Sequence, residues 1–116
     1  MTWPRALGLA LCCMLGTQAH AHAFLDHAQP RVGSTVAAAP AAVTLTFSQQ
    51  IEPAFSSVKV MDANGRPADK GDVRVTGAQM QVSLAALAPG HYTVKWRVVS
   101  TDTHVTEGDF VFHVAP

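Results

Sequence analysis

The sequence has no excess of charge of either sign, and it has few charged residues at all. Eight lysines and arginines balance eight aspartates and glutamates, and charged residues make up only 14% of the 116 residues. A nucleic-acid-binding protein normally carries a basic surface that neutralises phosphates, so this balance argues against nucleic acid as a partner. Because 48% of the residues are hydrophobic, the chain can form a buried core, and intrinsic disorder is not expected.

Cysteine is absent from everything that follows residue 21, because the two cysteines of the chain are Cys12 and Cys13. If residues 1–21 are removed on export, the remaining protein has no disulfide and no thiolate. Zinc-finger, iron–sulfur and thiol chemistry are then excluded. A blue-copper electron-transfer site is excluded as well, because it requires a cysteine ligand.

Residues 1–21 have the features of a secretory signal peptide. Arg5 supplies the positive start, residues 6–16 form an apolar run too short to span a bilayer, and Ala19-His20-Ala21 offers a small-x-small cleavage pattern. We therefore expect a signal peptide over 1–21 and a single domain over 22–116. Because Ala21-His22-Ala23 has the same pattern, cleavage two residues later, before Phe24, is the alternative.

Apolar and polar residues alternate at period two beyond the signal peptide, and no segment has a convincing helical period. The clearest predicted strands are 43–47, 57–61, 80–84, 92–98 and 110–114. Turn residues separate them at 62–65, 70–72 and 88–90, and the Ala/Pro-rich segment 36–42 is expected to be a connector. Short strands at this spacing favour an all-β fold, an antiparallel two-sheet β-sandwich, with a small β-barrel as the alternative.

Histidine is abundant for so short a chain, with six residues. His113 lies between two inward-facing apolar residues and is expected on the surface, and His91 is expected at the edge of a turn. His104 differs because Asp102 precedes it by two positions. In an extended segment such side chains share one face, with Cα atoms about 6.5–7 Å apart, so both can reach one ion. A plain hydrogen bond between them in a polar loop is the alternative.

Cleavage before His22 would add a second source of ligands. A free α-amine and the imidazole of the same residue can chelate one metal ion, and with Asp102 and His104 they offer about four donor atoms, mostly nitrogen. A mixed nitrogen and oxygen set suits tetragonal copper(II), which also stands highest in the divalent affinity order. Met80 fits an inward strand position and Met61 precedes a turn, so no methionine-type copper(I) site is expected.

A series of short motifs extends over nearly all of the chain beyond residue 21. In order, they are His22-Ala23-Phe24-Leu25, Pro30-x-x-Gly33-Ser34, Leu45-Thr46-Phe47-Ser48, Phe55-Ser56-Ser57-Val58-Lys59-Val60, Pro89-Gly90-x-Tyr92-x-Val94-x-Trp96-Arg97-Val98-Val99-Ser100, and Asp102-x-His104 with Gly108 and Phe110-x-Phe112. In these motifs the chain resembles the periplasmic copper-resistance CopC/PcoC family.

The resemblance implies an immunoglobulin/cupredoxin-like Greek-key β-sandwich located in the periplasm. It also implies a copper(II) site formed by His22, Asp102 and His104, and an inner-membrane copper transporter of the CopD type as partner. The methionine-rich loop by which some members hold copper(I) is missing between residues 61 and 80.

Two further positions bear on the metal site that the resemblance implies. Gln49 stands where family members often have an acidic residue, which removes a possible carboxylate near the copper. Asp26 and His27 are a candidate accessory donor pair, with an ordinary polar surface as the alternative.

The leading functional hypothesis is therefore a periplasmic copper(II)-binding protein, expected to be a monomer and not an enzyme, that sequesters copper or delivers it to a membrane transporter. A small copper oxygenase with an N-terminal histidine chelate is a second hypothesis. Its weaknesses are the single tyrosine, Tyr92, and the position of Asp102, where oxygen activation needs an open site. A metal-free interaction domain is the third, because a β-sandwich does not by itself decide function.

Overall fold

The computed structural model describes residues 23–116, so the predicted signal peptide and His22 lie outside the described residues. Strands dominate the described part of the chain, which also has one short 3-10 turn, η1. The elements are β1 (Leu25–Gln29), β2 (Thr35–Val36), β3 (Ala42–Phe47), η1 (Pro53–Phe55), β4 (Ser57–Met61), β5 (Arg74–Thr76), β6 (Gln79–Ser83), β7 (Gly90–Val99) and β8 (Val105–Val114). Over residues 23–116 no helix is long and apolar enough to cross a membrane.

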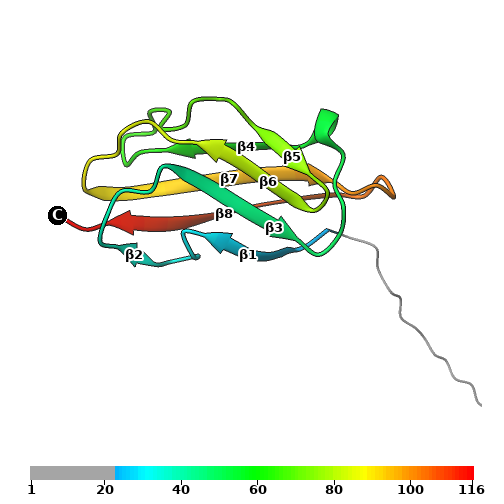
Figure 1. Cartoon of the computed structure of the whole chain (residues 1–116), viewed down its shortest axis with the longest axis horizontal. Coiled ribbons are helices and arrows are strands. Elements are labelled where there is room, and N and C mark those ends of the chain that lie inside the picture. Colours follow the sequence, from blue (N-terminus) through cyan, green and yellow to red (C-terminus); the bar gives the residue numbers. More distant parts are fainter. Residues whose placement is uncertain (1–22) are drawn as a thin grey trace, which may run out of the picture.

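The strands form two four-stranded sheets that face each other (Figure 1). One sheet has the order β1-β3-β6-β5, and the other has the order β2-β8-β7-β4. The chain changes sheet repeatedly, for example between β3 and β4 and between β6 and β7, as in Greek-key sandwiches. The predicted fold class, an antiparallel β-sandwich, is confirmed, and the barrel alternative is wrong. Among the described strands, β2 departs from the antiparallel pattern because it runs parallel to β8.

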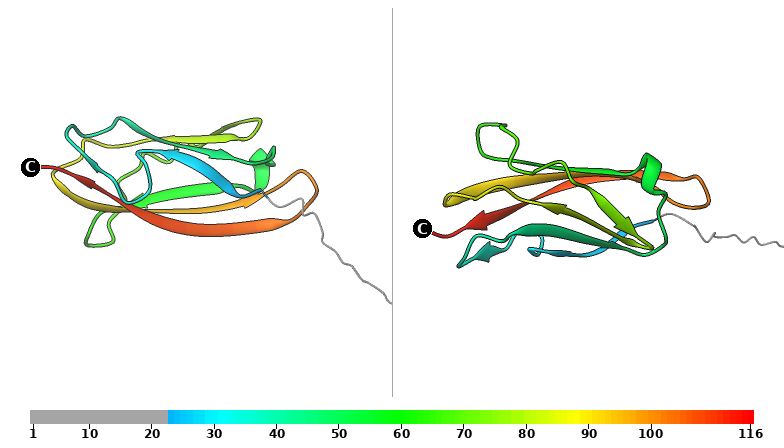
Figure 2. Two further views of the ribbon diagram at one scale, coloured as in Figure 1. Left: turned by 90° about the horizontal axis from the view of Figure 1, so that it is seen from below. Right: turned by 45° about the horizontal axis from the view of Figure 1, so that its top comes forward.

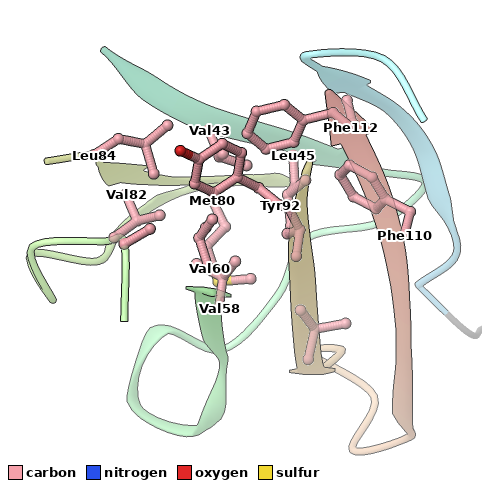
Figure 3. Close-up of a cluster of buried hydrophobic side chains, with 14 of the residues drawn as sticks. Val43, Leu45, Val58, Val60, Met80, Val82, Leu84, Tyr92, Phe110 and Phe112 are labelled. Carbon is pink, nitrogen blue, oxygen red and sulfur yellow. The ribbon is translucent and has the colours of Figure 1, made fainter. Parts of the chain in front are cut away.

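The core lies between the two sheets. It is built from the inward-facing residues of strands in which buried and exposed positions alternate (Figure 3). Its largest fully buried side chains include Phe112, Leu45 and Met80. Met80 therefore fills the core, as its strand position predicts. Tyr92 and Phe112 stack with ring centroids 5.5 Å apart, which ties β7 to β8. The inward positions predicted in the strands 43–47, 80–84, 92–98 and 110–114 are confirmed, with Trp96 half-buried against the core.

The structure differs from the sequence prediction mainly at the sheet edges. β1, β2 and β5 were not predicted, and each is an edge strand of two to five residues. In β1 a register irregularity between Leu25 and His27 interrupts the alternation on which the prediction relied. The segment predicted as a connector, 36–42, is one except at its ends, because Val36 belongs to β2 and Ala42 to β3.

The hairpin of β7 and β8 spans the length of the sandwich (Figures 1 and 2). Each strand has ten residues, so the turn that joins them lies at one end and their outer ends lie at the other. In the middle, Trp96 lies over Gly108 and meets Phe47 of the opposite sheet edge-on, at 5.2 Å between ring centroids. A Cβ at position 108 would come within 2.8 Å of the Trp96 ring, so the approach requires glycine.

Asp72 is expected to make stability depend on pH in acid. Its carboxylate accepts hydrogen bonds from the Ser83 hydroxyl at 2.6 Å and the Ser83 backbone N–H at 2.9 Å, and these bonds lower the pKa of Asp72 to about 2. Because the pKa is lower in the folded state, the contribution is complete above about pH 4 and is lost as the pH falls toward 2. Urea unfolding at several pH values should show a shallower acid loss of unfolding free energy in Asp72→Asn than in the wild type. Equal slopes would contradict this assignment.

Candidate metal site

The candidate ligands Asp102 and His104 lie in the tight loop of residues 100–104 that joins β7 to β8. The backbone N–H of Ser100 donates to the His104 carbonyl at 2.9 Å, and the N–H of Thr103 donates to the Ser100 carbonyl at 2.8 Å. Thr103 has a φ of 71°, a left-handed conformation that threonine rarely adopts. These constraints hold Asp102 and His104 close together at the end of the rigid hairpin.

The two side chains are in direct contact. His104 Nδ1 lies 3.1 Å from Asp102 Oδ2, and the buried hydroxyl of Ser100 donates to Asp102 Oδ1. The Ser100 hydroxyl, together with the His104 side chain and backbone N–H, holds the pKa of Asp102 below its usual range. With side-chain exposures of 33% for Asp102 and 53% for His104, a charged carboxylate and an imidazole are both open to solvent.

The spacing of this pair fits a transition-metal ion. Two adjacent ligands bonded at about 2.0–2.2 Å and at right angles to the ion lie about 3 Å from each other. The Nδ1 to Oδ2 distance of 3.1 Å is close to that value, so both atoms can bind one ion with little movement of the side chains. The same distance also fits the alternative stated from the sequence, a plain hydrogen bond between Asp102 and His104.

The structure does not assemble a complete ligand set from the residues it describes. Within residues 23–116 there is no group of three or more His, Cys, Asp or Glu side chains able to hold a metal. The structure therefore brings together two of the three predicted ligands. His22, the third, lies outside the described residues.

The chain immediately after residue 22 is anchored beside the candidate site. Ala23 is completely buried, and its carbonyl accepts a hydrogen bond from the Thr106 hydroxyl at 2.7 Å. The backbone N–H of Phe24 donates to Ser48 Oγ at 2.9 Å, and the N–H of Ser48 donates back to the Phe24 carbonyl at 2.8 Å. Thr106 lies two positions beyond His104 on β8, so these bonds fix the start of the described chain close to the Asp102–His104 pair.

Sequence reasoning missed the residues that position this site. Ser100 orients Asp102, and Thr106 holds Ala23. Ser100 could have been suspected because it precedes Asp102 by two positions. Thr106 could have been suspected because it continues the face of β8 that carries Gly108 and Phe110. Neither pattern identifies the group to which the hydroxyl donates its hydrogen bond.

The other predicted candidates lie elsewhere or offer no ligand. Asp26 and His27 line a hollow on β1 with Arg31 and Ser34, and they do not join Asp102 and His104 in a metal-binding group. Gln49 is half-buried and supplies no carboxylate. The carbonyl of the next residue, Gln50, accepts a hydrogen bond from the Thr101 N–H at 3.2 Å, so this segment does support the loop.

Similarity to known proteins covers nearly the whole described chain. The family model described as the CopC domain matches residues 25–115. Protein YobA of Escherichia coli K12 is 37% identical over 115 residues, which is 94% of this chain and 91% of that protein. Copper resistance protein C of Pseudomonas syringae pv. tomato is 34% identical over 110 residues, covering 87% of this chain and 86% of that protein.

Crystal structures of similar proteins have the same fold. CopC from Methylosinus trichosporium OB3b superposes with a TM-score of 0.77 at 37% identity, covering 82% of this chain and 95% of that one. PcoC, a methionine-rich copper resistance protein from Escherichia coli, superposes with a TM-score of 0.71 at 31% identity, covering 81% and 99%. At these identities the likeness extends beyond the fold to the sequence.

Proposed function

This chain belongs to the CopC family, and on that premise we propose that it is a periplasmic copper(II)-binding protein that sequesters copper or delivers it to a membrane transporter. Proteins similar to it are named for copper resistance and copper transport, which supports a copper-related function. The observation that carries the proposal is the Asp102–His104 pair, held at metal-ligand spacing beside the anchored Ala23.

We propose His22 as the third ligand residue, through its imidazole and a free α-amine. Consecutive Cα atoms are about 3.8 Å apart, so a chain that begins at His22 begins next to Ala23. Thr106, which holds Ala23, lies two residues beyond His104, about 7 Å away along the chain. An amine and imidazole attached there are within reach of an ion bound to the pair. The proposed set is His22, Asp102 and His104.

The donor chemistry favours copper(II) over copper(I). Imidazole, amine and carboxylate are the ligands of tetragonal copper(II), whereas copper(I) prefers sulfur. Met80 is buried in the core and is not available as a soft ligand. The depressed pKa of Asp102 keeps its carboxylate charged at neutral and mildly acidic pH. Four protein donors would leave a bound copper(II) ion without an open position for oxygen chemistry, and the proposed role is therefore copper binding without catalysis.

The setting follows from the same proposal. Residues 1–21 act as a signal peptide, cleavage after Ala21 releases a domain over 22–116 into the periplasm, and the domain works as a monomer. A copper transporter of the inner membrane, of the CopD type, is the proposed partner. Copper transport protein CutJ of Bacillus subtilis, 31% identical over 98 residues that make up 18% of that protein, is named for copper transport, which supports a role in copper delivery.

The position of the N-terminus tests the proposal directly. The intact mass of the exported protein should correspond to a chain that begins at His22. In isothermal titration, that chain should bind one copper(II) ion tightly, because the α-amine and imidazole chelate it together. A chain that retains Ala21 keeps the imidazole but moves the amine, and a chain that begins at Phe24 loses both. Both should bind copper(II) much more weakly, and equal affinity in all three chains would refute the proposed ligand set.

A further inference from the structure

His91 and His113 face each other across the β7–β8 hairpin, at the end opposite the candidate copper site. They are register partners in the antiparallel ladder, and their rings are 5.9 Å apart between centroids with an interplanar angle of 65°. Their neighbours Tyr92 and Phe112 point into the core, so the two imidazoles stand on the outer face of the sheet. Both histidines are exposed to solvent.

The backbone hydrogen bonds bring these two side chains as close as a ladder allows. The N–H of His113 donates to the Ser34 carbonyl at 2.8 Å, on the side of β8 that faces β2. His113 therefore directs its backbone groups away from β7, and His91 and His113 form a non-hydrogen-bonded pair. In such pairs the Cα atoms are about 4.5 Å apart and the side chains are closest.

This separation suits an ion shared by two imidazoles. With bonds of about 2.0–2.1 Å from one nitrogen of each ring and a tetrahedral angle at the metal, the ring centroids would be about 5 Å apart. The observed 5.9 Å needs less than about 1 Å of closure by side-chain rotation, which exposed histidines can make without moving the strands.

The surroundings admit a cation. The histidines line an open hollow of about 650 Å³ with Thr35, Pro89 and Pro116, and no charged side chain lines it. Along the outer face of the strands, Thr93 and Val111 come next. The charged residues Lys95 and Asp109 are four positions from the pair, about 13 Å away.

Asp62 and His91 line a neighbouring hollow. The Asp62 carboxylate accepts hydrogen bonds from the backbone N–H groups of Asn64 and Arg66 at 2.9 Å, so it stabilises its own turn and is not part of the proposed ligand set. Water would fill the remaining coordination positions of an ion bound to the two imidazoles.

We propose that His91 and His113 form a second metal site, which binds a divalent transition-metal ion such as copper(II) or zinc. Imidazole is a good ligand for both ions. His91 is eight residues from Val99 along β7, about 26 Å, so an ion here would not touch the Asp102–His104 pair. The site is independent of the proposed function, and it would allow the protein to carry a second ion at its other end.

Nuclear magnetic resonance with copper(II) as a paramagnetic probe tests this site. Copper(II) is added to the exported protein in excess of one equivalent, and the amide signals are followed. The second equivalent should broaden the signals of residues 90–93 and 111–114. His91→Gln and His113→Gln should each weaken the second binding step at least about tenfold, because two-point chelation becomes a single contact. The first step should be unchanged in both variants.

His27→Gln is the matched control. His27 is another exposed histidine on an outer strand, but its register partner is Thr46 and not a second histidine. Its replacement should leave the second step unchanged. The proposal is overturned if the second step keeps its affinity in both His91→Gln and His113→Gln, or if the broadening centres on His27. The broadening is measured at residues 90–93 and 111–114. Copper(II) binding at this site can therefore be detected even if no ion binds to the Asp102–His104 pair.

Discussion

Replacing His104 by alanine is expected to lower the copper(II) affinity of the chain that begins at His22 at least about 100-fold. Loss of a group that only supports a ligand typically costs 10–100-fold in metal affinity, so loss of a direct ligand should cost no less than about 100-fold. His22→Ala should have an effect of the same order, because the amine remains but the chelate ring through the imidazole is lost. Isothermal titration in the presence of a competing copper(II) chelator measures both.

Three further variants separate ligation from support at this site. Asp102→Asn keeps the shape of the side chain but removes its charge and should weaken binding strongly. Thr106→Val removes only the hydrogen bond to the Ala23 carbonyl and should weaken binding about tenfold, through the position of the N-terminus. His27→Ala, on the surface of β1, should leave the affinity unchanged. Wild-type affinity in both His22→Ala and His104→Ala would show that copper binds elsewhere.

Replacing Phe112 by alanine is expected to cost about 3–5 kcal/mol of unfolding free energy. Phe112 is 0% exposed, its ring stacks on Tyr92, and it is among the largest fully buried side chains of the described residues. Because small domains are stable by only about 5–15 kcal/mol, this variant should melt far below the wild type. Urea unfolding followed by tryptophan fluorescence measures the loss.

Phe55→Ala is the matched control, because it makes the same chemical change on the surface. Phe55 lies in η1 and is 65% exposed. Its replacement should change the free energy of unfolding by no more than about 0.5 kcal/mol. A loss for Phe112→Ala no larger than about 0.5 kcal/mol, as expected for Phe55→Ala, would contradict the predicted contribution of Phe112 to stability.

Much of the fold was predictable because its central strands have a strong local signal. In β3, β6, β7 and β8, one face meets the other sheet and the other faces solvent, so apolar residues recur at every second position. β4 follows the same rule, and its predicted bounds agree with the structure. The missed strands β1, β2 and β5 are short or irregular, so they leave too little alternation to recognise, whereas the edge strand β4 alternates over five residues.

The candidate copper site was predictable to the extent that it is local. Asp102 and His104 are two positions apart, and the chemistry of a carboxylate beside an imidazole depends on residue type and spacing alone. The geometry of the pair depends in addition on Ser100 and the left-handed Thr103, which close the loop. Residue spacing does not indicate these contacts, because they depend on the backbone path of the whole loop.

The sequence by itself determined the class of fold, the absence of thiol ligands beyond residue 21 and the pair of neighbouring donors. Only the tertiary structure decided which distant groups meet. Ala23 reaches Thr106 across 83 residues, and His91 faces His113 because of the register of the β7–β8 ladder. Strand pairing and sheet packing bring such groups together through backbone hydrogen bonds and core burial. Both depend on the whole chain at once, whereas a local sequence pattern reports only on its own segment.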